Sequence, residues 1–171
     1  MKILDATCGE KGIWLQKNHP LVTFMDKRKG KYYYASKDCT KVRYNVEPNI
    51  VCEWKDAPFP DNHFDMIVFD PPHIVRKETT KSSMITEYGS LQPDTWNIEI
   101  KEGVKKLFDI LKPEGIFIFK WSDNGGLKIN NVLKLFPYKP LFGSTKDGNW
   151  WLVFLKYDVN QKLDVKSCCY R

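Results

Sequence analysis

Residues 64–73 of the chain read Phe64-Asp65-Met66-Ile67-Val68-Phe69-Asp70-Pro71-Pro72-His73. The run Met66–Phe69 is apolar without alternation, which is typical of a strand buried on both faces of a parallel sheet. The two prolines cannot donate hydrogen bonds to a neighbouring strand, so the strand must end at Asp70. A carboxylate, a backbone carbonyl and a flat ring therefore stand together where open α/β sheets bind their ligands. Such a turn can accept hydrogen bonds from an –NH2 group and stack on the ring that carries it.

Further apolar runs on either side of this stretch alternate with polar or helical segments. The helices expected are a short one over Glu10–Lys17, a longer one over Thr95–Leu111 and one near Leu127–Phe136. The strands expected are Met1–Leu4, Leu21–Met25, Asn49–Cys52, Asp65–Phe69, Ile116–Lys120, Tyr138–Phe142 and Trp150–Lys156. The last two indicate an antiparallel hairpin with a loop longer than the tightest kind. This order predicts an α/β fold with a mostly parallel central sheet and helices on both faces.

Composition places the chain among ordinary globular proteins. Its 171 residues fit one domain, which we expect over residues 1–157, followed by a polar tail over 158–171. The net charge of +6 weakly favours a polyanionic partner. We expect a cytoplasmic protein without a metal site, because there is no signal peptide, no apolar run of membrane length and no metal-binding cysteine spacing. The five cysteines are Cys8, Cys39, Cys52, Cys168 and Cys169.

Polar residues follow each of the first four predicted strands. Small residues after the first strand let the backbone approach a ligand closely, and Asp26 after the second stands where an acid can hold two ribose hydroxyls. After the third, Glu53 offers an acceptor for an exocyclic amine and Trp54 an indole for a purine face. The residues expected to bind a nucleoside ligand are Asp5, Ala6, Thr7, Cys8, Gly9, Asp26, Lys27, Glu53, Trp54 and Asp70.

These motifs together resemble those of the class I S-adenosylmethionine-dependent methyltransferases, over nearly the whole of Ile3 to Lys156. The segment Leu4–Gly9 is similar to the first motif of that family, and Phe24-Met25-Asp26 to the second. Glu53 resembles the acid of that family that contacts adenine. The following segment Asp56–Asp65 resembles the segment that leads into the fourth strand. Asp70-Pro71-Pro72-His73 resembles the turn of enzymes that methylate exocyclic amino groups, and short phage-type enzymes with this turn are the nearest resemblance.

The resemblance implies a Rossmann-like methyltransferase fold, S-adenosylmethionine as cofactor and amino-group methylation. Asp70 and the carbonyl of Pro71 would accept hydrogen bonds from the –NH2 group, in the turn that Pro72 completes, and a neutral His73 would stack on the base. The sequence departs from the family at Thr7 and Lys11, where glycines are frequent, and at His73, where Tyr, Phe or Trp is usual. It also opens directly on the first predicted strand, so we expect no covering helix before it.

The substrate surface is expected to include Arg76 and Tyr88 in the loop after the turn, and Trp121 at the end of a later strand. Basic loops with aromatic residues suit phosphate contact and base stacking, although a solvated loop fits the same pattern. A nucleic acid is the expected substrate, with adenine N6 in DNA ahead of RNA, and a partner subunit for target recognition is possible. The alternatives are a protein glutamine, a small-molecule amine, and a catalytically silent binding subunit.

Overall fold

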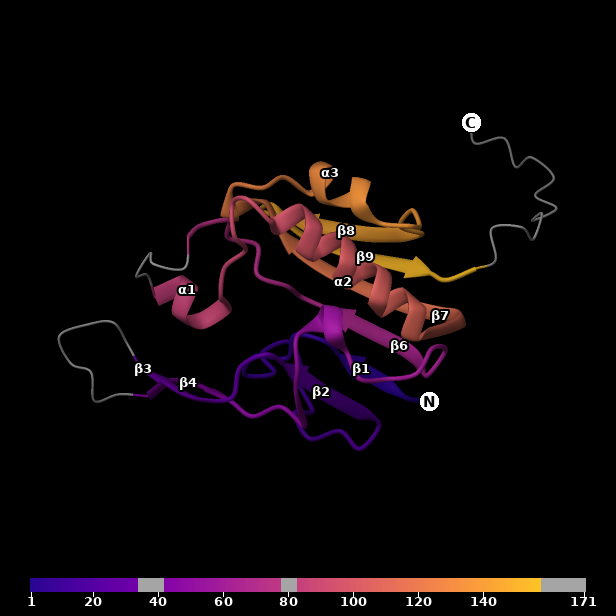
Figure 1. Ribbon diagram of the computed structural model, residues 1–171, viewed down its shortest axis with the longest axis horizontal. Coiled ribbons are helices and arrows are strands. Elements are labelled where there is room, and N and C mark those ends of the chain that lie inside the picture. The colour runs from indigo at the N-terminus through magenta and orange to yellow at the C-terminus, as the bar shows by residue number, and fades with distance from the viewer. Residues whose placement is uncertain (34–41, 78–82, 158–171) are drawn as a thin grey trace.

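The computed structural model describes residues 1–33, 42–77 and 83–157 of the chain. A seven-stranded sheet runs through it in the order β5-β2-β1-β6-β7-β9-β8 (Figure 1). Its strands are β1 (Ile3–Asp5), β2 (Val22–Asp26), β5 (Ile50–Val51), β6 (Phe64–Phe69), β7 (Leu111–Ser122), β8 (Phe142–Lys146) and β9 (Asn149–Leu155). The predicted tail from residue 158 lies outside the described residues.

Strand β6 is the centre of the sheet, as its unbroken apolar run predicts. It pairs in parallel with β1 on one side and with β7 on the other, and β2 and β5 continue the parallel half. Strand β9 returns antiparallel to β7, and β8 closes the edge as the antiparallel hairpin. The predicted α/β fold with a mostly parallel sheet and a C-terminal antiparallel hairpin is thus confirmed. The carboxyl ends of β1, β2, β5 and β6 lie along one edge of the sheet.

The helices α2 (Trp96–Ile110) and α3 (Ile129–Val132) pack on the same face of the sheet (Figure 1). The long helix α2 crosses β6 and β7, and α3 with the short 3-10 helix η3 (Leu133–Leu135) lies toward β8. Phe117 of β7 stacks on Phe108 of α2, with ring centroids 4.6 Å apart. These rings belong to the main hydrophobic core, to which β1, β2, β6, β7 and β9 all contribute side chains. Burial of this apolar surface stabilises the fold.

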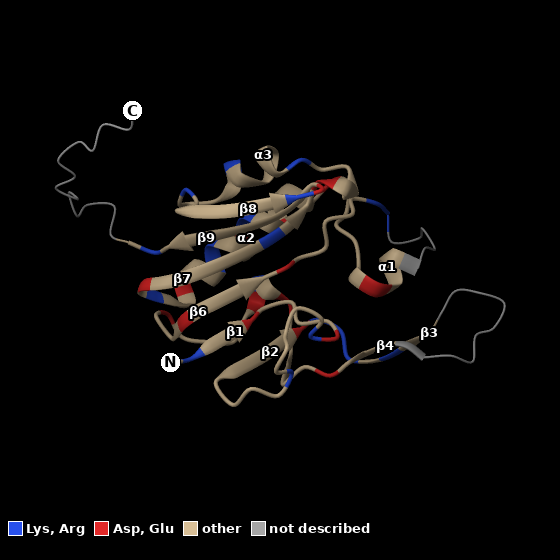
Figure 2. Ribbon diagram, turned by 180° about the vertical axis from the view of Figure 1, so that it is seen from behind, with Lys and Arg blue, Asp and Glu red and all other residues tan. Residues whose placement is uncertain are grey.

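The opposite face of the sheet differs from the prediction of helices on both faces. In the part of the chain that the structure describes, no helix lies across it (Figure 2). Residues Ile3, Val22 and Phe24 are buried there mainly by the β1–β2 connection, through Cys8 and Trp14. Farther along the same face, side chains of β7 and β8 remain open to solvent, including Ile116 and Phe142.

Three local predictions are wrong. The expected helix over Glu10–Lys17 is a series of turns, because Gly9 and Lys11 both have positive φ angles and Lys11 N bonds back to Cys8 O. The expected strand over Tyr138–Phe142 begins only at Phe142. The β8–β9 hairpin is also tight rather than long: Asp147 and Gly148 both have φ above zero and form a two-residue turn.

The polar segment after Asp26 forms a separate two-stranded hairpin of β3 (Gly30–Tyr33) and β4 (Val42–Val46), which extends beyond the carboxyl edge of the sheet. A short helix, α1 (Ser83–Tyr88), lies above it after the proline turn (Figure 1). The Tyr44 hydroxyl of β4 is hydrogen-bonded to the Glu87 carboxylate of α1. In the described residues no helix is long and apolar enough to cross a membrane.

Helix α2 also fixes Trp54, which lies in the 3-10 helix η1 (Trp54–Asp56). A Cβ atom on Gly103 of α2 would overlap the Trp54 indole ring. We therefore expect Gly103→Ala to lower the free energy of unfolding by about 1 to 3 kcal/mol, because overpacking outweighs the better helix propensity of alanine. Urea unfolding followed by tryptophan fluorescence measures the loss. Gly12→Ala is the control, because no atom lies within 4 Å of a Cβ there, and equal stability of the two variants would contradict the prediction.

Candidate active site

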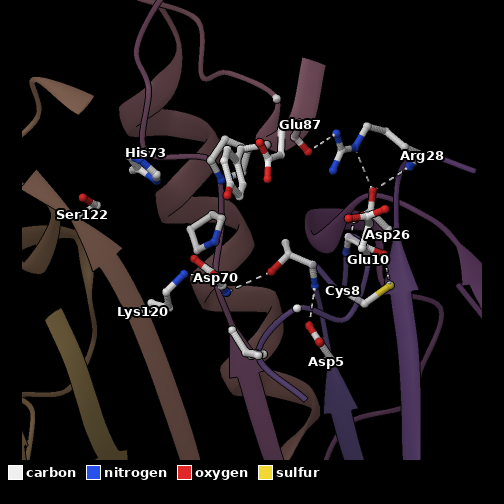
Figure 3. A pocket seen from close by; sticks show the side chains of 18 of the residues that line it. Asp5, Cys8, Glu10, Asp26, Arg28, Asp70, His73, Glu87, Lys120 and Ser122 are labelled. Carbon is white, nitrogen blue, oxygen red and sulfur yellow. Dashed lines mark hydrogen bonds and ion pairs between the residues drawn. The ribbon is translucent and has the colours of Figure 1, made fainter. Parts of the chain in front are cut away.

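A cavity of about 530 Å³ opens at the carboxyl edge of the sheet (Figure 3). Residues that follow β1, β2, β6 and β7 line it, together with α1 and Tyr44 of β4. Its size is in the range of pockets that bind small organic ligands. Among the residues predicted for a site, the cavity is lined by Asp5, Thr7, Cys8, Gly9, Asp26, Lys27, Trp54, Asp70, Pro71, Pro72, His73 and Tyr88.

The proline turn is held in place by residues from both neighbouring strands. The backbone N–H of Asp70 donates to the Thr7 hydroxyl oxygen at 2.9 Å. The Nζ atom of Lys120, near the end of β7, lies 2.6 Å from Oδ2 of Asp70. Burial raises the pKa of Asp70, and the neighbouring Lys120 charge opposes that rise. Thr7 thus holds the proline turn in place through its hydroxyl group. Glycine is frequent at this position in the class I methyltransferases that the sequence resembles.

Asp5 at the end of β1 is almost completely buried. Its carboxylate accepts hydrogen bonds from the Trp14 indole N–H at 2.6 Å and from the Thr7 N–H at 3.1 Å. Burial nevertheless raises its pKa to about 7, because desolvation of the charged form outweighs both hydrogen bonds. Asp5 therefore changes charge near neutral pH on the wall of the cavity.

This pKa makes the stability of the protein depend on pH. The folded state binds the Asp5 proton more tightly than the unfolded state, so the free energy of unfolding falls as pH rises from about 4 through about 7. We expect the Asp5 contribution to fall by about 2 to 3 kcal/mol between pH 5 and pH 8. Asp5→Asn should remove that part of the slope and be the more stable protein at pH 8. Urea unfolding of both proteins at the two pH values measures it, and parallel pH profiles would refute the assignment.

Asp26 at the end of β2 connects the turn after β1 to α1. Its Oδ2 accepts from the Gly9 N–H at 2.9 Å, and its Oδ1 accepts from the backbone N–H of Arg28 at 2.9 Å and from Nε of Arg28 at 3.3 Å. The Arg28 guanidinium continues to the Glu87 carbonyl oxygen at 2.9 Å. Arg28 therefore links the acid at the bottom of the cavity to the helix above it (Figure 3).

The turn after β5 contributes an aromatic wall and leaves its acid outside. Trp54 is buried, contacts Phe69 edge to face, and lines the cavity. Glu53 does not line the cavity, and instead pairs with Lys27 at 3.4 Å and Lys55 at 3.5 Å. The structure thus brings Trp54 to the site that the sequence predicts and places the Glu53 carboxylate among surface lysines.

His73 is on the opposite side of the proline turn from Asp26, and its neighbours there are aromatic. Its ring centroid lies 6.2 Å from that of Tyr88 and 6.4 Å from that of Trp121. A Cβ on Gly125 would overlap the His73 carbonyl, so only glycine allows the chain after β7 to pass there. Burial lowers the pKa of His73, which favours the neutral ring that the stacking role requires.

Four of the predicted site residues lie outside the cavity. Ala6 and Glu53 are not among its lining residues, and Arg76 is exposed. Trp121 is 1% exposed, stacks on Phe119 and donates its indole N–H to the Leu127 carbonyl, so it belongs to the core. The cavity is also lined by residues outside the predicted set, which are Glu10, Gly12, Ile13, Arg28, Tyr44, Met84, Glu87, Gly89, Lys120, Ser122, Asn124 and Asn149.

The fold is similar to that of several solved structures, among them S-adenosylmethionine-dependent methyltransferases. The PH0226 protein of Pyrococcus horikoshii OT3 matches with a TM-score of 0.59 and 17% identity, over 92% of this chain and 82% of that one. A TehB-like S-adenosylmethionine-dependent methyltransferase of Corynebacterium glutamicum matches with a TM-score of 0.54 and 16% identity, over 92% and 80%.

A third similar structure contains bound ligands. It is the 1,6-didemethyltoxoflavin-N1-methyltransferase of Burkholderia thailandensis with 1,6-didemethyltoxoflavin and S-adenosylhomocysteine, at a TM-score of 0.51 and 14% identity, over 91% of this chain and 71% of that one. No protein-family model matches the sequence, and no curated protein resembles it by sequence. At these identities the comparisons show that the chain has the methyltransferase fold.

Proposed function

We propose that this protein is an S-adenosylmethionine-dependent methyltransferase that acts on an exocyclic amino group of a nucleobase, foremost adenine N6 in DNA. The observation that supports this most is that the Asp70-Pro71-Pro72-His73 turn opens into the same cavity as Asp5 and Asp26. A turn able to hold an –NH2 group thus adjoins the part of the fold where a nucleoside cofactor belongs. The turn also resembles that of short phage-type methyltransferases in sequence.

The residues present fit this cofactor in part. Trp54 offers an indole surface, the small residues after β1 leave the backbone accessible, and Asp26 offers carboxylate lone pairs near Lys27. The Asp26 oxygens already accept from Gly9 and Arg28, so ribose hydroxyls would share this acid with them. When bound, the cofactor supplies an electrophilic methyl group. The protein contributes the walls that orient it.

The proline turn would orient the substrate amine. An exocyclic nitrogen of adenine is a poor nucleophile because its lone pair is delocalised into the ring. Hydrogen bonds from the –NH2 group to the Asp70 carboxylate and the Pro71 carbonyl favour a pyramidal nitrogen with a free lone pair. The His73 ring stacks on the base, and Tyr88 lies beside it. Positioning and local electrostatics then supply most of the acceleration.

A nucleic-acid substrate is supported by the charge around the cavity. Lys29 and Lys31, at the start of the β3–β4 hairpin, are exposed, and so are Arg76 and Lys77 ahead of α1. Figure 2 shows basic residues on both segments, on the side of the molecule that carries α1. Phosphate groups of a strand could contact these residues while a base extruded from the stack enters the cavity.

Two measurements test the proposal. Isothermal titration with S-adenosylmethionine asks whether the cavity binds the cofactor, and the absence of binding would leave a silent binding subunit as the better reading. Transfer of labelled methyl groups to duplex DNA, single-stranded DNA, tRNA and protein extract then identifies the acceptor. We expect incorporation into DNA, at adenine N6 by nucleoside analysis. Incorporation into protein alone would overturn the nucleobase assignment and leave the methyltransferase assignment standing.

A further inference from the structure

The ion pair between Lys120 and Asp70 is the strongest feature of the cavity that the proposed mechanism does not use. Nζ of Lys120 lies 2.6 Å from Oδ2 of Asp70, and both residues line the cavity. The same two strands carry a second pair at their opposite ends, Lys112 with Asp65 at 2.7 Å, which lies outside the cavity. The pair at the cavity therefore places a cation where a substrate would bind.

The two groups of this pair have opposite hydrogen-bonding capacities. An ionised carboxylate only accepts hydrogen bonds, and an ammonium group only donates them. Figure 3 shows the two side chains meeting beside the proline turn. The pair thus presents an acceptor and a donor next to each other. An amino group on an adenine or cytosine ring has the complementary arrangement, because a ring nitrogen that accepts hydrogen bonds lies beside the –NH2 group: N1 or N7 in adenine, and N3 in cytosine.

We propose that Asp70 and Lys120 act as one recognition pair, in which Asp70 accepts from the substrate –NH2 group and Lys120 donates to the ring nitrogen beside it. This inference rests on the proposed function and narrows its substrate class. Lys120 is then a specificity-determining residue that favours an amino group adjacent to an acceptor. Simple amines, which lack that acceptor, would satisfy Asp70 and leave Lys120 without its second partner.

The recognition pair can contact a substrate without first coming apart. Lys120 bonds to Oδ2 of Asp70, and within the described ranges no other side chain is hydrogen-bonded to this carboxylate. Oδ1 is therefore available to an –NH2 group. The ammonium group has three donors, of which Asp70 occupies one. Lys120 lines the cavity and its side chain is 28% exposed, so the ammonium group is accessible to a ligand there.

Substrates with single ring atoms replaced test the proposal. Duplexes that contain 1-deazaadenine or 7-deazaadenine keep the –NH2 group, and each lacks one of the two acceptors that flank it. We expect one of the two analogues to lower kcat/KM of the wild-type protein by about 10- to 100-fold, the effect of losing a hydrogen bond to a charged group. Lys120→Met should act on adenine and that analogue equally. Lys120→Arg, which keeps a donor, should restore part of the difference.

Lys112→Met is the matched control, because it removes the same charge and the same kind of ion pair from the same two strands. It should retain the wild-type ratio between adenine and the analogue. Equal rates of the wild-type protein on adenine and both analogues would overturn the inference, as would an unchanged ratio in a folded Lys120→Met variant. Cofactor binding without transfer to any nucleobase would instead refute the proposed function, and the recognition pair with it.

Discussion

Asp70→Ala is expected to lower methyl transfer by at least about 100- to 1,000-fold while S-adenosylmethionine affinity stays within a few-fold of wild type. The carboxylate is at the centre of the proline turn, where it accepts from Lys120 and faces the space for the substrate amine. Its removal takes away the acceptor for the –NH2 group. The backbone N–H that bonds to Thr7 is retained. Steady-state transfer of labelled methyl groups and cofactor titration measure the two quantities separately.

Asp65→Ala is the control for this variant. Asp65 is also in an ion pair with a lysine of β7, at the other end of β6, and it lies outside the cavity. It should retain nearly full turnover. Wild-type turnover of Asp70→Ala would remove Asp70 from the mechanism. A loss of turnover accompanied by an equal loss of cofactor affinity would show that the acid serves the cofactor rather than the amine.

Asp26→Ala is expected to weaken S-adenosylmethionine binding by about 10- to 100-fold. The change removes the acceptor proposed for the ribose hydroxyls. It also releases the Gly9 N–H and the Arg28 side chain, which hold the turn after β1 and the helix α1 around the cavity. Calorimetric titration with the cofactor measures the affinity.

A loss of cofactor affinity in Asp26→Ala identifies a binding residue only if the variant is folded. Thermal unfolding without cofactor shows whether the variant is folded at the titration temperature. Asp61→Ala, which removes an exposed acid outside the cavity, should bind the cofactor as the wild type does. An unchanged dissociation constant for a folded Asp26→Ala protein would exclude this acid from the cofactor site.

The sequence predicts most of the sheet because its strands carry local signals. The unbroken apolar run Met66–Phe69 and the two prolines after it locate β6 and its end within a residue. The acids Asp5 and Asp26 then fall at one edge, because parallel strands place their carboxyl ends together. The long helix is located equally well, since its buried residues recur at helical spacing.

The parts that the sequence did not predict depend on contacts between distant segments. Lys120 alternates with apolar residues in β7, and nothing in that strand indicates an acid partner fifty positions earlier. Arg28 stands in a basic run that resembles a solvated surface, and only the fold brings the carbonyls of α1 to it. The helix expected at Glu10–Lys17 fails because Lys11 adopts a left-handed conformation that its residue type does not signal.

The order of the strands has a consequence for how this protein folds. In the half of the sheet that holds the cavity, every strand pairs with a neighbour that is distant in the chain, whereas β8 and β9 are joined by a two-residue turn. Non-local pairings form slowly because long segments must first be brought together. The cavity is lined from several of these distant segments, so a chain that has formed only its β8–β9 hairpin has no ligand site.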